Sequence, residues 1–192
     1  KLVRPNIGVI TNIAQAHIEN FKNIKGIAKA KSEIINNIVQ DGTVVLNRDD
    51  KFFNYLKSKA RRKKIKILSF GRSKKADVYL IKNKQTGKNN TLKIRAVNEI
   101  LSIKVNGKDN LNISNVLCCI AVLKILNLDL EKIGRFFEKI HSLTGRGKIH
   151  DIVRYKTKFK LIDESYNANP LSVKNAIMNL SNIKNNNCKK YA

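Results

Sequence analysis

Three segments of the chain carry residue types that could do chemistry, and each lies beside a segment of regular apolar spacing. The first segment, residues 11–19, follows a short apolar strand and contains Asn12, His17 and Glu19. In open α/β sheets ligands bind beyond the carboxyl ends of the strands, so these side chains are placed to meet a ligand or a hard cation. The alternative is that His17 is an ordinary surface histidine of a loop.

The second candidate is a lysine that interrupts the apolar stripe of a helix predicted over residues 24–38. Lys31 lies one turn after Ile27 and one turn before Ile35, whereas Lys29 falls on the other side and can face water. In this position the Lys31 side chain can extend past the margin of the stripe into water. Alternatively, it is buried and has a dedicated partner or a modification. The spacing alone leaves both possibilities open.

The third candidate is a polar run between a predicted strand and a predicted helix near the end of the chain. Asp163 and Glu164 end the strand, and Pro170 opens the helix where its missing N–H is harmless. Asn169 fits the N-cap of this helix. A cap does not explain the density of hydrogen-bonding residues between the carboxylates and the helix, which includes Asn167.

The elements that must position these residues alternate between strand-like and helix-like apolar spacing. This alternation predicts an α/β fold with a mostly parallel sheet flanked by helices, to which strands with short connections add a small antiparallel appendage. We expect Asp49 to cap the second helix. The predicted strands are residues 6–11, 43–47, 65–70, 77–82, 91–97, 100–105, 149–155 and 159–162, and the predicted helices are residues 24–38, 49–60, 112–126, 129–140 and 170–183.

A break at Gly145-Arg146-Gly147 marks the most evident boundary along the chain. It predicts one domain over residues 1–142 and the beginning of a second over residues 143–192. No apolar run reaches the roughly 18 residues that a membrane span needs, and no signal peptide is recognisable. We therefore expect a cytoplasmic protein without a membrane span.

The charge balance of the 192 residues raises nucleic acid as a partner. Lys and Arg total 39 against 14 Asp and Glu, which gives a formal net charge of +25. The basic residues are spread along the whole chain, however, and the few aromatics, 6% with no Trp, do not interleave with them as stacking platforms would. This pattern favours solvent-facing lysines over specific nucleic-acid binding. A basic, non-enzymatic nucleic-acid-binding module is the alternative from another functional class.

Taken together, three runs resemble the Mur ligase family: TN…HIENF in residues 11–21, AKAKSEI in residues 28–34 and DESYNANP in residues 163–170. The resemblance extends over nearly the whole chain in the family's order and is strongest to the MurF branch. The SYNANP run is its most specific element, since the MurE branch carries a DYAHxP-type run there. A MurE-like ligase or a folylpolyglutamate synthase relative is the nearest alternative.

The resemblance implies an ATP-dependent, amide-forming ligase of peptidoglycan precursor synthesis, and so of cell wall biogenesis. Such an enzyme uses ATP and Mg²⁺ to join D-alanyl-D-alanine to UDP-MurNAc-tripeptide through an acyl phosphate, as a monomer. Residues 1–142 would then be the later part of the central P-loop-type domain, and residues 143–192 the beginning of a Rossmann-like C-terminal domain. We expect the chain to be an internal piece without the Gly-rich phosphate-binding loop, and by itself inactive.

The same resemblance implies the roles of residues in the first two runs and at a later helix. His17 would bind magnesium, and Lys31, carbamylated by carbon dioxide, would support that metal centre. Asn12 would lie near the nucleotide. Asn112 and Asn115 match an adenine-reading HNxxN element in which Leu111 replaces the usual histidine.

The third run and the glycine break complete the implied site. Arg146 matches an arginine that contacts ATP. Asp163 and Glu164 would lie near the ribose and the phosphates, and Asn167 and Asn169 would face substrate between the two domains.

Overall fold

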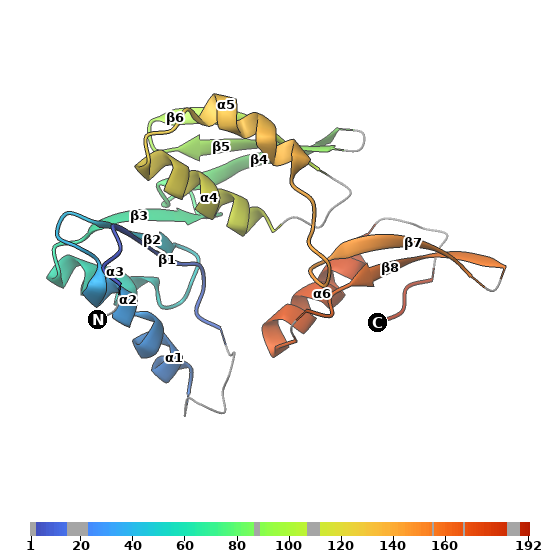
Figure 1. Ribbon diagram of the computed structural model, residues 1–192, viewed down its shortest axis with the longest axis horizontal. Helices are drawn as coiled ribbons and strands as arrows, with labels where there is room; N and C mark the ends of the chain where they lie inside the picture. Colours follow the sequence, from blue (N-terminus) through green and yellow to red (C-terminus); the bar gives the residue numbers. More distant parts are fainter. Residues whose placement is uncertain are drawn as a thin grey trace.

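The centre of the fold is one six-stranded sheet in which the spatial order of the strands follows their order along the chain (Figure 1). Strands β1 to β4 run parallel to one another, and β5 and β6 extend the same sheet as antiparallel strands next to β4. The α/β fold with a mostly parallel sheet is therefore confirmed. The strands are β1 Ile7–Ile10, β2 Thr43–Asn47, β3 Lys66–Gly71, β4 Val78–Thr86, β5 Asn89–Ala96 and β6 Glu99–Asn106.

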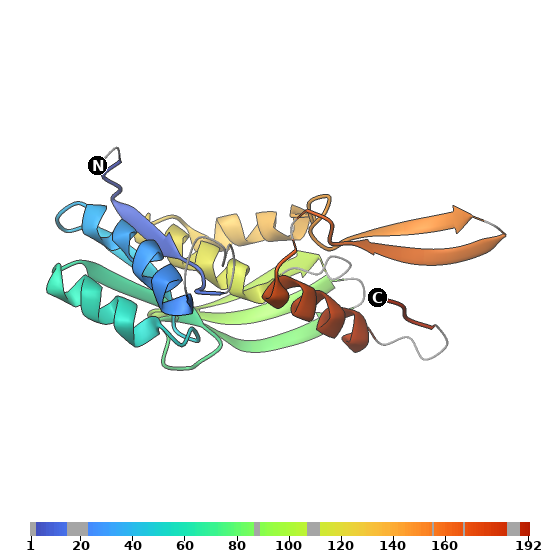
Figure 2. The same ribbon diagram turned by 90° about the horizontal axis from the view of Figure 1, so that it is seen from below.

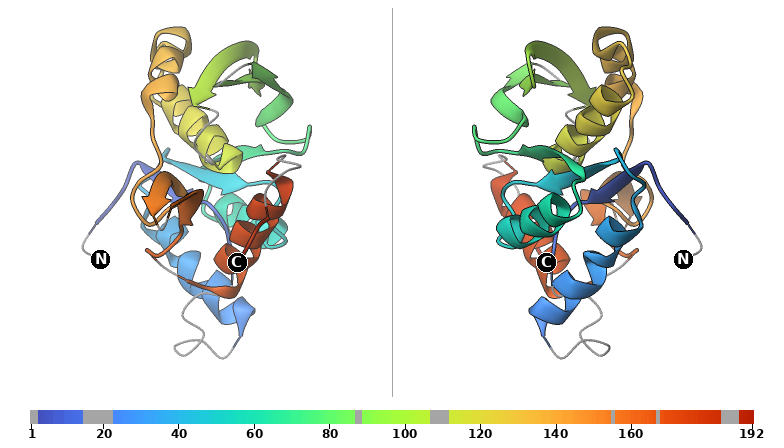
Figure 3. Two further views of the ribbon diagram at one scale, coloured as in Figure 1. Left: turned by 90° about the vertical axis from the view of Figure 1, so that its right-hand side faces the viewer. Right: turned by 90° about the vertical axis from the view of Figure 1, so that its left-hand side faces the viewer.

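This computed structural model describes residues 3–14, 23–86, 89–106, 112–154, 156–166, 168–183 and 189–192. Within them, helices cover both faces of the sheet (Figure 3). The helices are α1 Ile24–Lys31, α2 Glu33–Asn37, α3 Phe53–Arg62, α4 Ile113–Ile125, α5 Leu130–Gly134, the 3₁₀ helix η2 Arg135–Lys139 and α6 Pro170–Asn182. None of the described helices is long and apolar enough to cross a membrane.

The sheet has a hydrophobic core on each of its faces, and side chains of β2 point alternately into one core and the other. Val44 and Leu46 pack with α1, α2 and α3, whereas Val45 points to the opposite face and packs with α4 and the ribbon strands. All three side chains are fully buried, as expected for a central parallel strand that is covered on both faces.

The helix predicted over residues 24–38 is two helices that meet at Ser32. The Ser32 side chain is fully buried, and its hydroxyl donates to the Lys29 carbonyl at 2.6 Å and accepts from Lys59 Nζ at 2.8 Å. A serine that bonds its own helix and a lysine of α3 competes with the regular helical ladder at this point. The break therefore depends on a partner from a distant element.

The prediction that Asp49 caps α3 is wrong. The helix begins at Phe53, and the residue at its N-cap position, Phe52, makes no side-chain cap. The Asp49 carboxylate instead accepts from the backbone N–H of Arg72 at 2.5 Å and of Ser73 at 3.1 Å. Asp49 thus joins the loop after β2 to the loop after β3.

The helix predicted over residues 129–140 consists of α5 followed by the 3₁₀ helix η2. Asp129 caps it as an acceptor for the N–H groups of Glu131 and Lys132, both at 3.1 Å. At Gly134 a Cβ atom would come within 2.9 Å of Ile103 Cγ2. Only a glycine allows the helix to approach β6 this closely.

The last part of the chain forms a separate antiparallel pair, β7 Lys148–Arg154 and β8 Thr157–Asp163, followed by α6. The hairpin projects away from the six-stranded sheet, beyond the carboxyl ends of its parallel strands (Figures 1 and 2). Apolar side chains on this unit are exposed, among them Val153 at 72%, Leu161 at 51% and Met178 at 51%. Among the residues of the hairpin and α6 whose burial the structure describes, none forms a buried core like that of the main sheet.

We predict that Leu117→Ala, on the buried face of α4, lowers the free energy of unfolding by about 3 kcal/mol, because it leaves a cavity in the core. Leu117 is 0% exposed, whereas Leu128, just after the same helix, is 44% exposed. The matched control Leu128→Ala should cost less than about 1 kcal/mol. Urea denaturation of the chain measures both, and equal losses would contradict this assignment of the core.

Candidate functional site

The backbone that leaves β1 is held by side chains from the next strand and from the loop that follows it. Asn47 Nδ2 donates to the Thr11 carbonyl at 2.9 Å, and the Asp50 carboxylate accepts from the Ile13 N–H at 2.6 Å. Asp50 also accepts from the Phe52 N–H at 2.8 Å. The start of the loop that carries the first candidate residues is therefore fixed by β2 and by the loop between β2 and α3.

Lys31 reaches the same place from the end of α1. Its Nζ donates to the carbonyl of Asn12 at 3.0 Å, and its side chain is exposed. The structure thus brings together Lys31 and Asn12, two residues that the sequence analysis placed in one site. The possibility that Lys31 is buried in the apolar stripe is wrong, because the fully buried position at this point of the chain is Ser32.

Sequence reasoning missed the polar cluster beneath this end of α1. Lys59 of α3 bonds the buried Ser32, and Tyr55 lies close to both. Hydrogen bonding with Ser32, and then the Lys59 ammonium, lower the pKa of Tyr55 below its ordinary value. Apolar spacing gives no sign of such a cluster, since Ser32 is 23 residues from Tyr55 and 27 residues from Lys59 along the chain.

His17 and Asn167 lie outside the described residues. Within the described part of the chain, no group of three or more His, Cys, Asp and Glu side chains could hold a metal ion. Magnesium prefers oxygen ligands, and an ammonium cannot ligate it. Lys31 could therefore support a magnesium ion at the end of β1 only after its side chain has become an anion.

The two asparagines expected at the adenine lie in the first turn of α4. Asn112 is the N-cap, and its side chain accepts from the Ser114 N–H at 3.0 Å. Asn115 is exposed, and its N–H donates to the Asn112 carbonyl at 2.9 Å. The cap engages the amide oxygen of Asn112, so Asn115 is the better placed of the two to contact a base. Leu111 lies outside the described residues.

Arg146 lies in the turn before β7, where its guanidinium carbon is 4.1 Å from the centre of the Tyr166 ring. A guanidinium placed over an aromatic ring in this way is held by its face and keeps N–H donors for other partners. The sequence analysis placed Arg146, Asp163 and Glu164 together; Arg146 lies in the turn before β7, Asp163 is the last residue of β8, and Glu164 follows it.

The two adjacent carboxylates, Asp163 and Glu164, have opposite environments. Hydrogen bonds from Ser165 and from the Gly145 N–H lower the pKa of Asp163, so this group is ionised at neutral pH. Partial burial, and then the negative charge of Asp163, raise the pKa of Glu164. Asp163 is therefore the fixed anion of the pair.

The predicted N-cap role of Asn169 is confirmed. Its side-chain oxygen accepts from the Ser172 N–H at 3.0 Å, and its own N–H donates to Ser172 Oγ at 2.9 Å. This reciprocal pair is a capping box at the start of α6. The contact of Asn169 with substrate stays a prediction.

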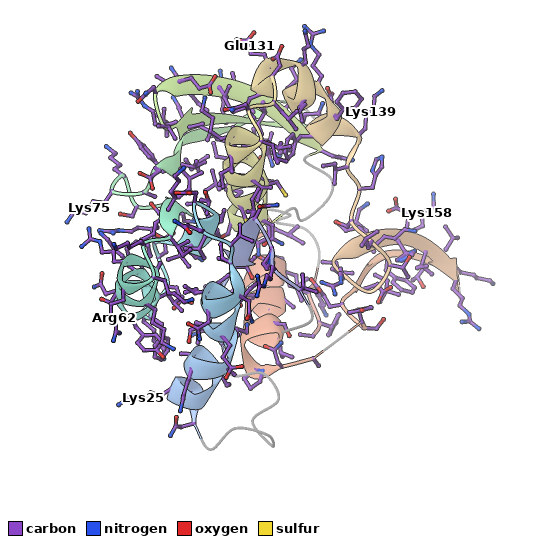
Figure 4. The ribbon with its side chains drawn as sticks, turned by 60° about the vertical axis from the view of Figure 1, so that its left-hand side comes forward. Lys25, Arg62, Lys75, Glu131, Lys139 and Lys158 are labelled. Carbon is purple, nitrogen blue, oxygen red and sulfur yellow. The ribbon has the colours of Figure 1, made fainter. Side chains whose placement is uncertain are left out.

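Basic residues lie on several faces of the molecule. Lys25, Arg62, Lys75, Lys139 and Lys158 point outward from five different parts of the chain (Figure 4). These five side chains fill ordinary solvent-facing positions.

Comparison with known proteins shows which family the chain resembles in sequence. Residues 1–123 match the family described as the Mur ligase middle domain. The UDP-N-acetylmuramoyl-tripeptide–D-alanyl-D-alanine ligase of Rickettsia prowazekii is 30% identical over 184 residues, which cover 95% of this chain and 40% of that protein. The chain spans about 40% of the length of this relative and of the ligase of the same name from Buchnera aphidicola.

Solved structures show the same similarity. A crystal structure of MurF from Acinetobacter baumannii superposes with a TM-score of 0.80 at 26% identity, over 94% of this chain and 38% of that one. A MurF ligase from Thermotoga maritima in complex with ADP gives a TM-score of 0.72 at 22% identity, over 92% of this chain and 39% of that one. The second likeness shows the shared fold.

The adjacent carboxylates Asp49 and Asp50 offer a matched test of how the loops are held. Asp50→Ala should speed amide hydrogen exchange at Ile13 and Phe52, and Asp49→Ala should instead speed it at Arg72 and Ser73, because each variant removes the acceptor of those N–H groups.

Residue-resolved NMR exchange measures both variants, and each serves as the control for the other. If both variants speed exchange at the same amides, the assignment of separate roles is wrong.

Proposed function

The chain belongs to the Mur ligase family, since the middle-domain match covers residues 1–123, and on this premise we propose that the complete protein is an ATP-dependent ligase of peptidoglycan precursor synthesis. It joins D-alanyl-D-alanine to UDP-N-acetylmuramoyl-tripeptide. The observation that carries the proposal is the similarity of 95% of this chain to a UDP-N-acetylmuramoyl-tripeptide–D-alanyl-D-alanine ligase. The SYNANP run before α6 supports the same branch of the family.

The reaction forms an amide bond in two steps. The terminal carboxylate of the tripeptide attacks the γ-phosphorus of ATP, which releases ADP and leaves an acyl phosphate. The amine of D-alanyl-D-alanine then attacks the acyl carbon, loses a proton and expels phosphate. Carboxylate and triphosphate repel one another, so groups of opposite charge must hold them together.

Lys31 and His17 would hold magnesium at the carboxyl end of β1, where the ion would neutralise the charges of the reacting groups. Lys31 serves this purpose as a carbamate. Its neutral amine forms a bond to the carbon of carbon dioxide and loses a proton, and the product is an anion. The exposed Nζ is accessible for this step, and the carbamate keeps one N–H that can still donate to the Asn12 carbonyl.

The nucleotide would lie between the main sheet and the C-terminal unit. Asn12, Asn112 and Asn115 face it from residues 1–142, which we assign to the central domain. Arg146 and Glu164 face it from residues 143–192, which we assign to the beginning of the C-terminal domain. The ADP held by a similar MurF structure supports an adenine nucleotide as the ligand.

The capping geometry at α6 bears on the peptide substrate. Asn169 is held by Ser172, so its position at the end of the polar run is fixed before any ligand arrives. We assign Asn167 and Asn169 to contacts with the peptide substrates at the same boundary. The protein is expected to act in the cytoplasm as a monomer.

Phosphate release by the complete purified protein tests the proposed reaction. We expect release that requires ATP, magnesium, UDP-MurNAc-tripeptide and D-alanyl-D-alanine together. Mixtures that lack one component are the controls. Activity with UDP-MurNAc-dipeptide and a diamino acid would assign the protein to the MurE-like alternative, and activity with a folate and glutamate would assign it to the folylpolyglutamate synthase alternative.

Lys31→Ala in the complete protein should lower the ligase rate by about 100-fold, because the metal centre loses an anionic support. Added short-chain carboxylates or bicarbonate should restore part of the activity, since a free anion can occupy the vacated place. Lys29→Ala is the matched control, because Lys29 is a neighbouring exposed lysine on the same helix, and its rate should be unchanged. Near-normal activity of Lys31→Ala, or a loss without any rescue, would contradict the carbamate.

A further inference from the structure

One carboxylate joins the turn before β7 to the turn after β8. Asp163 Oδ2 accepts from the Gly145 N–H at 2.9 Å, and the Asp163 carbonyl accepts from the Gly147 N–H at 2.8 Å. Its Oδ1 accepts from the N–H of Ser165 at 3.1 Å and from the hydroxyl of Ser165 at 2.6 Å. Both carboxylate oxygens are thus engaged by donors of the chain itself.

The residue between the two bound glycines is Arg146. Because the N–H groups of Gly145 and Gly147 are both tied to Asp163, the backbone on each side of Arg146 is fixed by this one residue. The Arg146 N–H donates to the Leu143 carbonyl at 3.0 Å, which closes the turn.

The same turn also sets the aromatic ring on which Arg146 stacks. The Tyr166 N–H donates to the Gly145 carbonyl at 3.1 Å, and Gly145 has a φ of +77°. A Cβ atom on Gly145 would lie 2.8 Å from Tyr166 Cβ, so only glycine permits this approach. Tyr166 follows directly on the Asp163–Ser165 turn, so its ring and the Arg146 backbone share one anchor.

We propose that Asp163 is a positioning residue that holds Arg146 and its stacking partner Tyr166 in the orientation needed to meet the triphosphate, and that it does not itself contact the nucleotide. The proposal rests on the role of Arg146 in the proposed function. It replaces the expectation that Asp163 lies against the ribose and the phosphates, and leaves that role to Glu164.

Charge and hydrogen bonding both support this assignment. Both oxygens of the Asp163 carboxylate are occupied by donors of the chain, and these donors favour its ionised form. His150 Nε2 lies 4.0 Å from Oδ2, so the remaining neighbour of that oxygen is also a group of this unit. Arg146 is therefore coupled through Asp163 to β7 and β8, and moves with them if the C-terminal unit turns against the main sheet.

A double-mutant cycle in the complete protein tests whether Asp163 acts through Arg146. Asp163→Asn removes the charge and one acceptor while it keeps the size of the side chain. We expect it to lower kcat/KM for ATP about 10-fold when Arg146 is present, and less than about 2-fold in the Arg146→Ala background. Arg146→Ala alone should lower kcat more than it raises KM, because the guanidinium acts on charge that develops during phosphoryl transfer.

Asp151→Asn is the matched control, because Asp151 is an exposed carboxylate of β7 that pairs with Lys160 on the neighbouring strand. It should leave both kinetic constants unchanged. An equal loss from Asp163→Asn in both Arg146 backgrounds would overturn the proposal, because Asp163 would then act independently of Arg146. No loss in either background would overturn it as well.

An NMR measurement keeps the test independent of ligase activity. The Tyr166 ring current shifts the side-chain protons of Arg146 in the stacked arrangement. Asp163→Asn should move these signals toward their values in an unstructured chain, whereas Asp151→Asn should not. Unchanged Arg146 signals in Asp163→Asn would overturn the positioning role even if the protein is a ligase, and loss of stacking would support it even if the ligase assay failed.

Discussion

The loops at the ends of the strands depend on aspartate carboxylates that accept hydrogen bonds from backbone N–H groups. Asp49 and Asp50 hold the loops after β3 and β1, Asp77 holds Ser69 at the β3–β4 connection, and Asp163 holds the turn before β7. Charge-assisted bonds of this kind are shorter and stronger than neutral ones. In a chain with 14 acidic residues against 39 basic ones, several of the few anions are placed where the backbone must be fixed.

These constraints explain how candidate residues from distant parts of the sequence come together. Asn12 lies at the end of β1 on a backbone that Asn47 and Asp50 fix on either side, and Lys31 reaches it from α1. Arg146 is fixed in a comparable way by Asp163 in the C-terminal unit. Both places lie toward the carboxyl ends of the parallel strands, where α/β sheets bind ligands (Figure 2).

Periodicity and turn residues predicted the strands, the antiparallel ribbon and the Asn169 cap, because these features depend on local sequence. The break at Ser32 and the bonds of Asp49 were not predictable in this way, since their partners are Lys59 of α3 and the backbone of residues 72 and 73. The exposure of Lys31 was left open for a related reason, as helical spacing does not say where a helix ends. The motif runs predicted that Lys31 and Asn12 share one site, and the structure places them in contact.

The central claim is that the end of β1 holds an anionic Lys31 while Arg146 meets the triphosphate from the C-terminal unit. A high-resolution crystal structure of the complete protein, grown with bicarbonate, magnesium and a non-hydrolysable ATP analogue, tests it most directly. The account predicts carbamate density on Lys31 Nζ facing the metal, and the Arg146 guanidinium within about 3 Å of a phosphate oxygen. A bare Lys31 amine still bonded to the Asn12 carbonyl, with Arg146 on Tyr166 and away from the phosphates, would contradict it.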